Sequence, residues 1–364
     1  MIFITGILKK LKNMSNTIAY VQNIERSKPP ATKSSGNSGI FKLFISDDKI
    51  IHPFRVIVNK EISDHIRSWR FIILLVLIAL TCLGSVYTGL ANIGEVAKST
   101  DPENPFLFLL LFTASDGTLP PFFVFISFLG PLLGISMGFD AINSEQSRGT
   151  LSRVLAQPVH RDYILNAKFV AALYVISVML FSLGFLVMGA GLIMTGIPPT
   201  PEEFLRVVFF ILVSILYVSF WLNLSILFSV RFRQPATSAL AGIAVWLLFT
   251  VFYGIIVSLI AKAASPSESA TTQQIVGYQE MIMNLLRVLP SQLYSDATTT
   301  LLAPTVRSLG PLTMDQIVGA IPGPLPLGQS LLLVWPQITG LTAATILCFV
   351  LSYVAFMRRE IRSR

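Results

Sequence analysis

The chain has 364 residues, of which 53% are hydrophobic and 13% are charged, whereas a soluble domain carries about 25% charged residues. This composition excludes a soluble globular protein and predicts an integral membrane protein. The formal net charge of +8 therefore belongs to loops that face an anionic lipid leaflet, and not to a nucleic-acid-binding surface.

Residues 1–53 are predicted to form a cytoplasmic, partly disordered region ahead of a membrane domain of residues 54–364. The tract of residues 27–38 is rich in Pro, Ser and Lys, which is typical of disorder. The first eleven residues are not predicted to be a signal peptide, because their lysines follow the apolar part instead of preceding it.

Residues 53–70 predict an amphipathic helix at the membrane surface. Its polar side includes Lys60, Glu61 and Arg67, and Trp69 and Arg70 stand where aromatic and basic side chains anchor a helix at the interface. Its apolar side consists of Val56, Ile57, Ile62 and Ile66.

Six apolar runs follow, each close to the length of about 20 residues that a helix needs to cross a bilayer. They are residues 71–93, 121–139, 169–194, 207–230, 237–261 and 331–356. A further apolar run at 106–113 is too short to cross, so we expect it to be re-entrant or packed at the outer side. With the N-terminus inside, 22 of the 27 Lys and Arg residues fall on the inner side, which predicts that both termini are cytoplasmic.

A polar island, residues 140–168, separates the second and third of these runs. Residues 144–155 predict a short helix, in which Glu145 and Arg148 can pair on one face. Pro158 ends this helix. Its apolar edge is formed by Leu151, Val154 and Leu155. A helix with one apolar and one charged edge is suited to docking in a groove of another protein.

The island also follows the pattern E-x3-G-T-x4-L-x2-P-x2-R-x6-K. The matching residues are Glu145, Gly149, Thr150, Leu155, Pro158, Arg161 and Lys168. This pattern resembles the first cytoplasmic loop of type-2 ABC transporter permeases, with one departure at Ala167, where a Gly is common. The helix at 53–70 is similar to the elbow helix of the same permeases, whose Lys-Glu pair is matched by Lys60 and Glu61.

The resemblance implies an all-α membrane protein with six transmembrane helices, an N-terminal interfacial elbow helix, a cytoplasmic coupling helix and a large outer loop. It implies a permease subunit that exports a cargo across the cytoplasmic membrane, pairs with a second permease copy or paralogue, and docks a separate ATPase subunit that binds the ATP. The implied coupling residues are Glu145, Arg148, Gly149, Thr150, Leu151, Leu155, Pro158, Arg161 and Lys168. The alternative for the island is a solvated loop whose charges only set the orientation.

Residues 262–329 form a long outer loop between the fifth and sixth runs. Helices are predicted at 271–288 and at 291–302, with Pro290 between them. Two roles stay open for this loop. One is a set of membrane-surface helices, which the resembling family carries there, and the other is a cap over the ends of the spans.

The sequence offers no site for catalysis, for a cofactor or for a metal ion. It contains no Gly-Lys dipeptide, so no phosphate-binding P-loop can be written. Its three histidines are scattered over cytoplasmic segments, and Cys82 and Cys348 lie inside apolar runs, so no disulfide framework is implied. The chain is therefore predicted not to be an enzyme, and ATP hydrolysis is expected in a partner chain.

The apolar runs contain no Asp, Glu, Lys, Arg or His, which argues against a proton-driven carrier. Their polar residues are expected to form hydrogen bonds between helices. These are Ser136, Asn223, Ser225 and Gln337. Two alternatives to the permease remain, a secondary carrier that works without an ATPase and a membrane scaffold that assembles other proteins.

Overall fold

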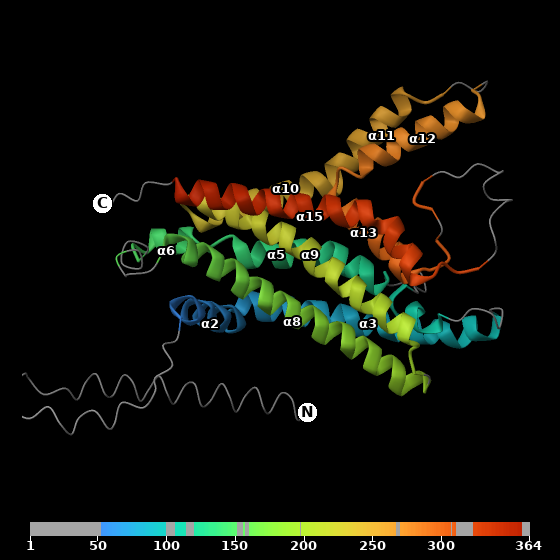
Figure 1. Cartoon of the computed structure of the whole chain (residues 1–364), viewed down its shortest axis with the longest axis horizontal. Coiled ribbons are helices and arrows are strands. Elements are labelled where there is room, and N and C mark those ends of the chain that lie inside the picture. The colour runs from blue at the N-terminus through green and yellow to red at the C-terminus, as the bar shows by residue number, and fades with distance from the viewer. Residues whose placement is uncertain are drawn as a thin grey trace, which may run out of the picture. The chain divides into compact units, whose positions relative to one another are not determined.

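The computed structural model describes residues 52–99, 106–113, 120–150, 156, 160–196, 198–266, 270–306, 308–310 and 323–358. These residues form helices and connecting turns, with no strand among them. Six stretches of helix are long and apolar enough to cross a membrane (Figure 1), as the sequence predicts. They are α3 (Trp69–Ser99), α5 (Phe122–Gly138), α8 (Arg161–Thr195), α9 (Pro201–Arg231), the series α10 (Pro235–Leu247), η3 (Leu248–Phe252) and α11 (Tyr253–Ala263), and α15 (Leu327–Met357). The predicted region 1–53 lies outside the described residues, except for its last two.

The prediction of one helix at 53–70 is wrong at its C-terminal end, because the structure divides these residues between two helices. The first part, α2 (Pro53–Ile66), stops before Arg67, so Trp69 and Arg70 belong to α3. Ser68 accounts for the break, since its hydroxyl donates to the carbonyl of His65 at 2.9 Å and accepts the backbone N–H of Phe71 at 3.3 Å. A serine that satisfies the first N–H groups of a helix fixes where that helix begins.

The fourth span begins earlier than predicted, at Pro201 instead of residue 207. Thr200 and Glu203 form a capping box, in which each side chain accepts the other's backbone N–H, at 3.2 and 2.8 Å. Glu203 and Arg206 are therefore part of the helix, and both are buried. The absence of Asp, Glu, Lys, Arg and His holds for the predicted apolar run but not for the whole helix.

Helix α9 lies at the centre of the bundle and packs against α5, α8, α10 and α15. Its tightest neighbour is α5, which presents Gly130, Gly134 and Gly138 on one face. A Cβ added at Gly134 would lie 2.7 Å from the carbonyl oxygen of Val218, so only glycine allows the two backbones to approach this closely. Ser225 strengthens the same contact by donating to the carbonyl of Ile135 at 3.0 Å.

The interhelical hydrogen bond predicted for Ser225 is thus confirmed, but the other polar residues in the spans behave differently. The Ser136 hydroxyl and the Gln337 amide donate to carbonyls of their own helices. Both amide atoms of Asn223 are buried without a hydrogen-bond partner in the described structure. Here it is the backbone carbonyl of Asn223 that reaches another helix, accepting the Ser352 hydroxyl at 3.3 Å.

The end of the bundle that holds the loop between the fifth and sixth spans is called the outer end, following the orientation predicted from Lys and Arg. There the short run 106–113 forms η2 (Leu107–Leu109) and α4 (Leu110–Thr113). Leu111 and Phe112 are fully buried, and the Phe112 ring lies 5.5 Å from the ring of Phe122 and 6.0 Å from that of Phe210. This run therefore packs on α5 and α9, which is one of its two predicted outcomes.

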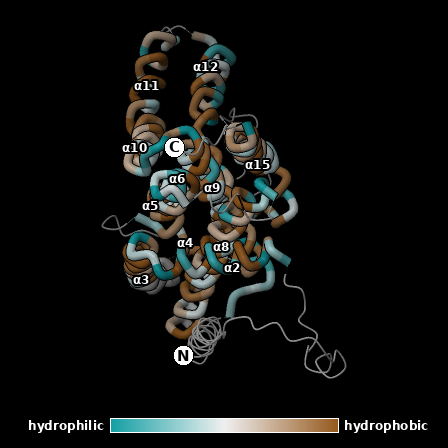
Figure 2. Tube along the Cα trace, turned by 90° about the vertical axis from the view of Figure 1, so that its left-hand side faces the viewer, coloured by the Kyte–Doolittle hydropathy of each residue, from teal (hydrophilic) through white to brown (hydrophobic). Residues whose placement is uncertain are grey.

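The outer loop contains the two predicted helices, α12 (Thr272–Leu286) and α13 (Pro290–Leu302). Helix α13 packs against α9 and α15, where Tyr294 stacks on Tyr217 with ring centroids 4.5 Å apart and shares a hydrogen bond of 3.0 Å with Ser214. Helix α12 has no buried residue and pairs with α11 in a hairpin that points away from the other helices (Figures 1 and 2). Helix α13 thus packs against the spans while α12 does not, and the two roles predicted for the loop stay predictions.

Candidate functional site

The described residues of the polar island lie at the inner end of the bundle, opposite α13 (Figure 1). Residues 139–150, which run from the end of α5 into the first described part of the island, are called the inner segment below. It contains α6 (Asn143–Ser147), which is far shorter than the helix predicted at 144–155. Gly149 explains the difference, because its φ of 67° is left-handed and ends the helix. Leu151, Leu155 and Pro158 lie outside the described residues, so the predicted apolar edge stays a prediction.

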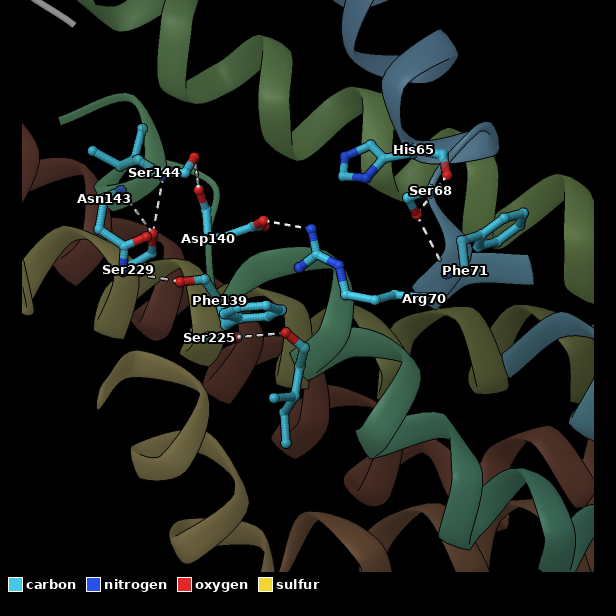
Figure 3. A network of polar contacts seen from close by, with 12 residues as sticks. His65, Ser68, Arg70, Phe71, Phe139, Asp140, Asn143, Ser144, Ser225 and Ser229 are labelled. Carbon is cyan, nitrogen blue, oxygen red and sulfur yellow. Dashed lines mark hydrogen bonds and ion pairs between the residues drawn. The ribbon is translucent and has the colours of Figure 1, made fainter. Parts of the chain in front are cut away.

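The start of α6 is fixed to the inner end of α9 (Figure 3). The hydroxyl of Ser229 accepts the backbone N–H groups of Ile142 at 2.9 Å and of Asn143 at 3.2 Å. The Asn143 amide donates to the carbonyl of Phe139 at 3.1 Å, and the Ser144 hydroxyl donates to that of Asp140. Ile142 and Asn143 are fully buried. Sequence reasoning missed this anchor, since nothing marks Ser229 among the serines of the spans.

Three charged side chains meet close to this anchor, and they are called the Lys168 triad. The ammonium of Lys168, on α8, lies 3.0 Å from a carboxylate oxygen of Glu61, on α2, and 2.8 Å from one of Glu145, on α6. Side-chain exposure is 7% for Lys168, 10% for Glu61 and 17% for Glu145. The predicted pairing of Glu145 with Arg148 is wrong, because the Glu145 carboxylate turns inward to Lys168.

A fourth residue, Lys60, lies at the edge of the triad. It is largely exposed, and its ammonium lies 2.9 Å from the second oxygen of Glu61 and 3.3 Å from a carboxylate oxygen of Asp64. Burial raises the pKa of Glu61, but Lys168 and Lys60 outweigh burial and hold this pKa below its usual value. Glu61 is therefore ionised at neutral pH, whereas one carboxylate oxygen of Glu145 is buried without a hydrogen-bond partner among the described residues.

A second ion pair joins the first two spans beside the triad. The Arg70 guanidinium lies 2.7 Å from the carboxylate of Asp140 and 4.8 Å from the centre of the Phe139 ring (Figure 3). A cavity of about 300 Å³ lies between this pair and Lys168. His65 lines it, and burial lowers the pKa of this imidazole, so the side chain is neutral at pH 7.

The structure brings some of the predicted site residues together and separates others. Glu145 and Lys168 meet in the triad with Glu61 and Lys60, and Arg148 lines the cavity. Gly149 and Thr150 form the turn after α6, in which the Thr150 N–H donates to the Glu145 carbonyl at 2.9 Å. Arg161 starts α8. Arg67 and Trp69 are exposed, with Trp69 at 76%. Contact of any of these residues with an ATPase stays a prediction.

Comparison with known proteins identifies relatives over most of the chain. The family model described as "ABC-2 family transporter protein" matches residues 55–361. The probable ABC transporter permease protein NosY of Stutzerimonas stutzeri is 25% identical over 206 residues, which cover 55% of this chain and 67% of that relative. NosY of Pseudomonas aeruginosa is 29% identical over 113 residues, which cover 31% of this chain and 36% of that relative.

Proposed function

Because the chain belongs to the ABC-2 family of transporter proteins, we propose that it is the membrane-spanning subunit of an ATP-driven exporter in the cytoplasmic membrane. Family membership and six apolar helices make it a multi-pass ABC transporter permease and not itself an enzyme. The proposal adds a separate ATPase subunit, a second permease copy or paralogue, cytoplasmic termini and transport of a cargo out of the cytoplasm.

The inner segment is the observation that carries the proposal. It connects α5 to the residues before α8, and Ser229 and Lys168 hold it to α9 and α8. A force on this segment therefore reaches three spans through buried contacts. An ATPase that docks there and closes on ATP would rock these spans together, which is the kind of rigid movement that packed helices transmit.

We place the docking surface on the residues that follow Ser147, and on Leu151 and Leu155 above all. Glu145 and Lys168 are unsuited to direct contact, because their charged groups are turned into the protein. Replacing both leucines by Ala removes methylenes that docking would bury, each contributing about 0.8 kcal/mol, so at least a tenfold weaker association is expected.

Co-purification tests the docking surface. The tagged wild-type chain, solubilised from its host, should bring down a P-loop ATPase, identified by mass spectrometry. The variant Leu151→Ala/Leu155→Ala should recover at least tenfold less of it at matched membrane expression. The control Leu80→Ala/Leu332→Ala removes the same atoms from exposed positions on α3 and α15 and should recover the wild-type amount. Equal recovery from both double variants would contradict the docking surface, and absence of any ATPase would contradict the exporter.

A further inference from the structure

We propose that Lys168 is a positioning residue that ties the inner segment to α2, so that a displacement of α6 moves α2 and the first span together with α8. The proposal rests on the function given above. It reassigns Glu145 and Lys168 from the surface that meets an ATPase, and Glu61 from the interfacial elbow helix, to a link inside the permease.

The link consists of three elements that contribute one charge each to the triad. Helices α2 and α8 pack along one another, and α6 lies over their shared end. The ammonium of Lys168 contacts both carboxylates at 2.8–3.0 Å, and no other cation touches Glu145 in the described part of the chain. Without Lys168 two carboxylates would face each other in a nearly buried site, which strongly disfavours their present arrangement.

The connection between α2 and the first span is short enough to pass on a movement. Only Arg67 and Ser68 separate α2 from α3, and the Ser68 hydroxyl bonds both helix ends. Helix α2 also borders the cavity of about 300 Å³ beside Lys168, which Glu61, Asp64 and His65 line. Close-packed interfaces resist displacement, so this cavity gives α2 room to shift relative to the inner end of α5.

Apolar contacts hold α2 on α8 independently of the triad. The rings of His52 and Phe54 lie 5.6 and 5.7 Å from the ring of Tyr163 on α8, and Ile62 packs on the bundle core. Loss of the triad is therefore expected to free α6 from α2 without releasing α2 from α8. The link can be tested without unfolding the protein.

The link can be tested by measuring the distance between two spin labels. In a chain whose two cysteines are replaced by serine, labels go to Val56→Cys on α2 and Met357→Cys at the inner end of α15, both exposed. The permease is purified with its ATPase, and the distance between the labels is measured before and after addition of a non-hydrolysable ATP analogue. We expect a shift in this distance in the otherwise unaltered complex.

Four variants separate positioning from stability. Lys168→Met should reduce the shift, because α2 then follows α8 alone, while ATPase recovery is unchanged, and Lys168→Arg should restore the full shift. The neutral triple variant Glu61→Gln/Glu145→Gln/Lys168→Met, which contains no unpaired carboxylate, should fold and show the same reduced shift. Lys262→Met, at the far end of α11, should behave as wild type.

The outcomes distinguish the link from the proposed function. A normal shift in Lys168→Met or in the triple variant would overturn the link, and so would a wild-type complex whose α2 does not move. Failure of the unaltered chain to recover any ATPase would overturn the proposed function instead.

Discussion

At the residue scale, Arg206 is the clearest case of a charge that the fold depends on. Its side chain is fully buried at the outer end of α9. The guanidinium lies 2.9 Å from the carboxylate of Glu202 and donates to the Ser330 hydroxyl at 3.2 Å and to the Leu301 carbonyl at 3.1 Å. It also donates to the Leu325 carbonyl. The planar fork of an arginine can serve all these acceptors at once, so one side chain joins α9, α13 and α15.

Replacement of Arg206 by Met should destabilise the outer end by about 3 kcal/mol, because several buried acceptors lose a charged donor. Lysine should rescue only part of this loss, since a single ammonium cannot reach all the acceptors. Heating in detergent followed by size-exclusion chromatography would measure the change as a lower temperature of aggregation. The control is Arg231→Met, at the exposed inner end of the same helix. The same temperature of aggregation for both variants would refute the role given to Arg206.

At the element scale, the contact between α5 and α9 depends on the absence of side chains. Cβ atoms added at Gly134 and Gly138 would meet backbone atoms of α9 at 2.7 and 2.8 Å. Backbone atoms cannot rotate away as a side chain can, so the helices would have to separate. Within lipid the hydrophobic effect does not drive helices together, so they associate through van der Waals packing, which small residues allow by letting the backbones approach closely.

Gly134→Ala should therefore destabilise the bundle by about 1–3 kcal/mol, the usual cost of overpacking a core. Gly254→Ala, in α11, is its matched control, because nothing lies within 4 Å of the added atom. There the better helix propensity of Ala should make the change neutral or slightly stabilising. Thermal stability of the two variants, measured side by side, should differ in this direction, and equal stability would show that α5 and α9 tolerate separation.

Sequence patterns predicted the six spans because an apolar run of membrane length has few other uses. They failed at helix ends, where a few polar atoms decide at which residue a helix begins or stops. The break at Ser68, the capping box at Thr200 and the end of α6 at Gly149 each depend on one or two local hydrogen bonds or on one left-handed residue. The glycines on α5 recur at every fourth residue, but this spacing alone does not say which helix they contact.

The candidate site was also predicted only in part. A motif pointed to Glu145 and Lys168, and the Lys-Glu pair pointed to Glu61. Their meeting could not be predicted, because it depends on how α2 packs along α8, and these helices are far apart in the sequence. Spacing alone predicted that Glu145 pairs with Arg148. In the folded chain the Glu145 carboxylate instead contacts the nearly buried ammonium of Lys168.

At the scale of the whole molecule, the distribution of positive charge predicts the orientation in the membrane. The inner segment and the hairpin of α11 and α12 are at opposite ends of the spans, and 22 of 27 Lys and Arg residues fall on the side of the inner segment when the N-terminus is inside. Positive charge is retained on the cytoplasmic side during insertion. The Lys168 triad and the proposed docking surface would then both face the compartment that contains ATP.

Single cysteines in the chain free of native cysteines test this orientation in intact cells. Ser265→Cys, exposed beyond α11, should react with a membrane-impermeant maleimide. Ser147→Cys, exposed at the end of α6, should be protected until the cells are opened. Both positions are accessible in the folded chain, so a difference in labelling reports sidedness and not burial. Labelling of Ser147→Cys from outside, with protection of Ser265→Cys, would place the inner segment away from ATP and remove the physical basis of the proposed coupling.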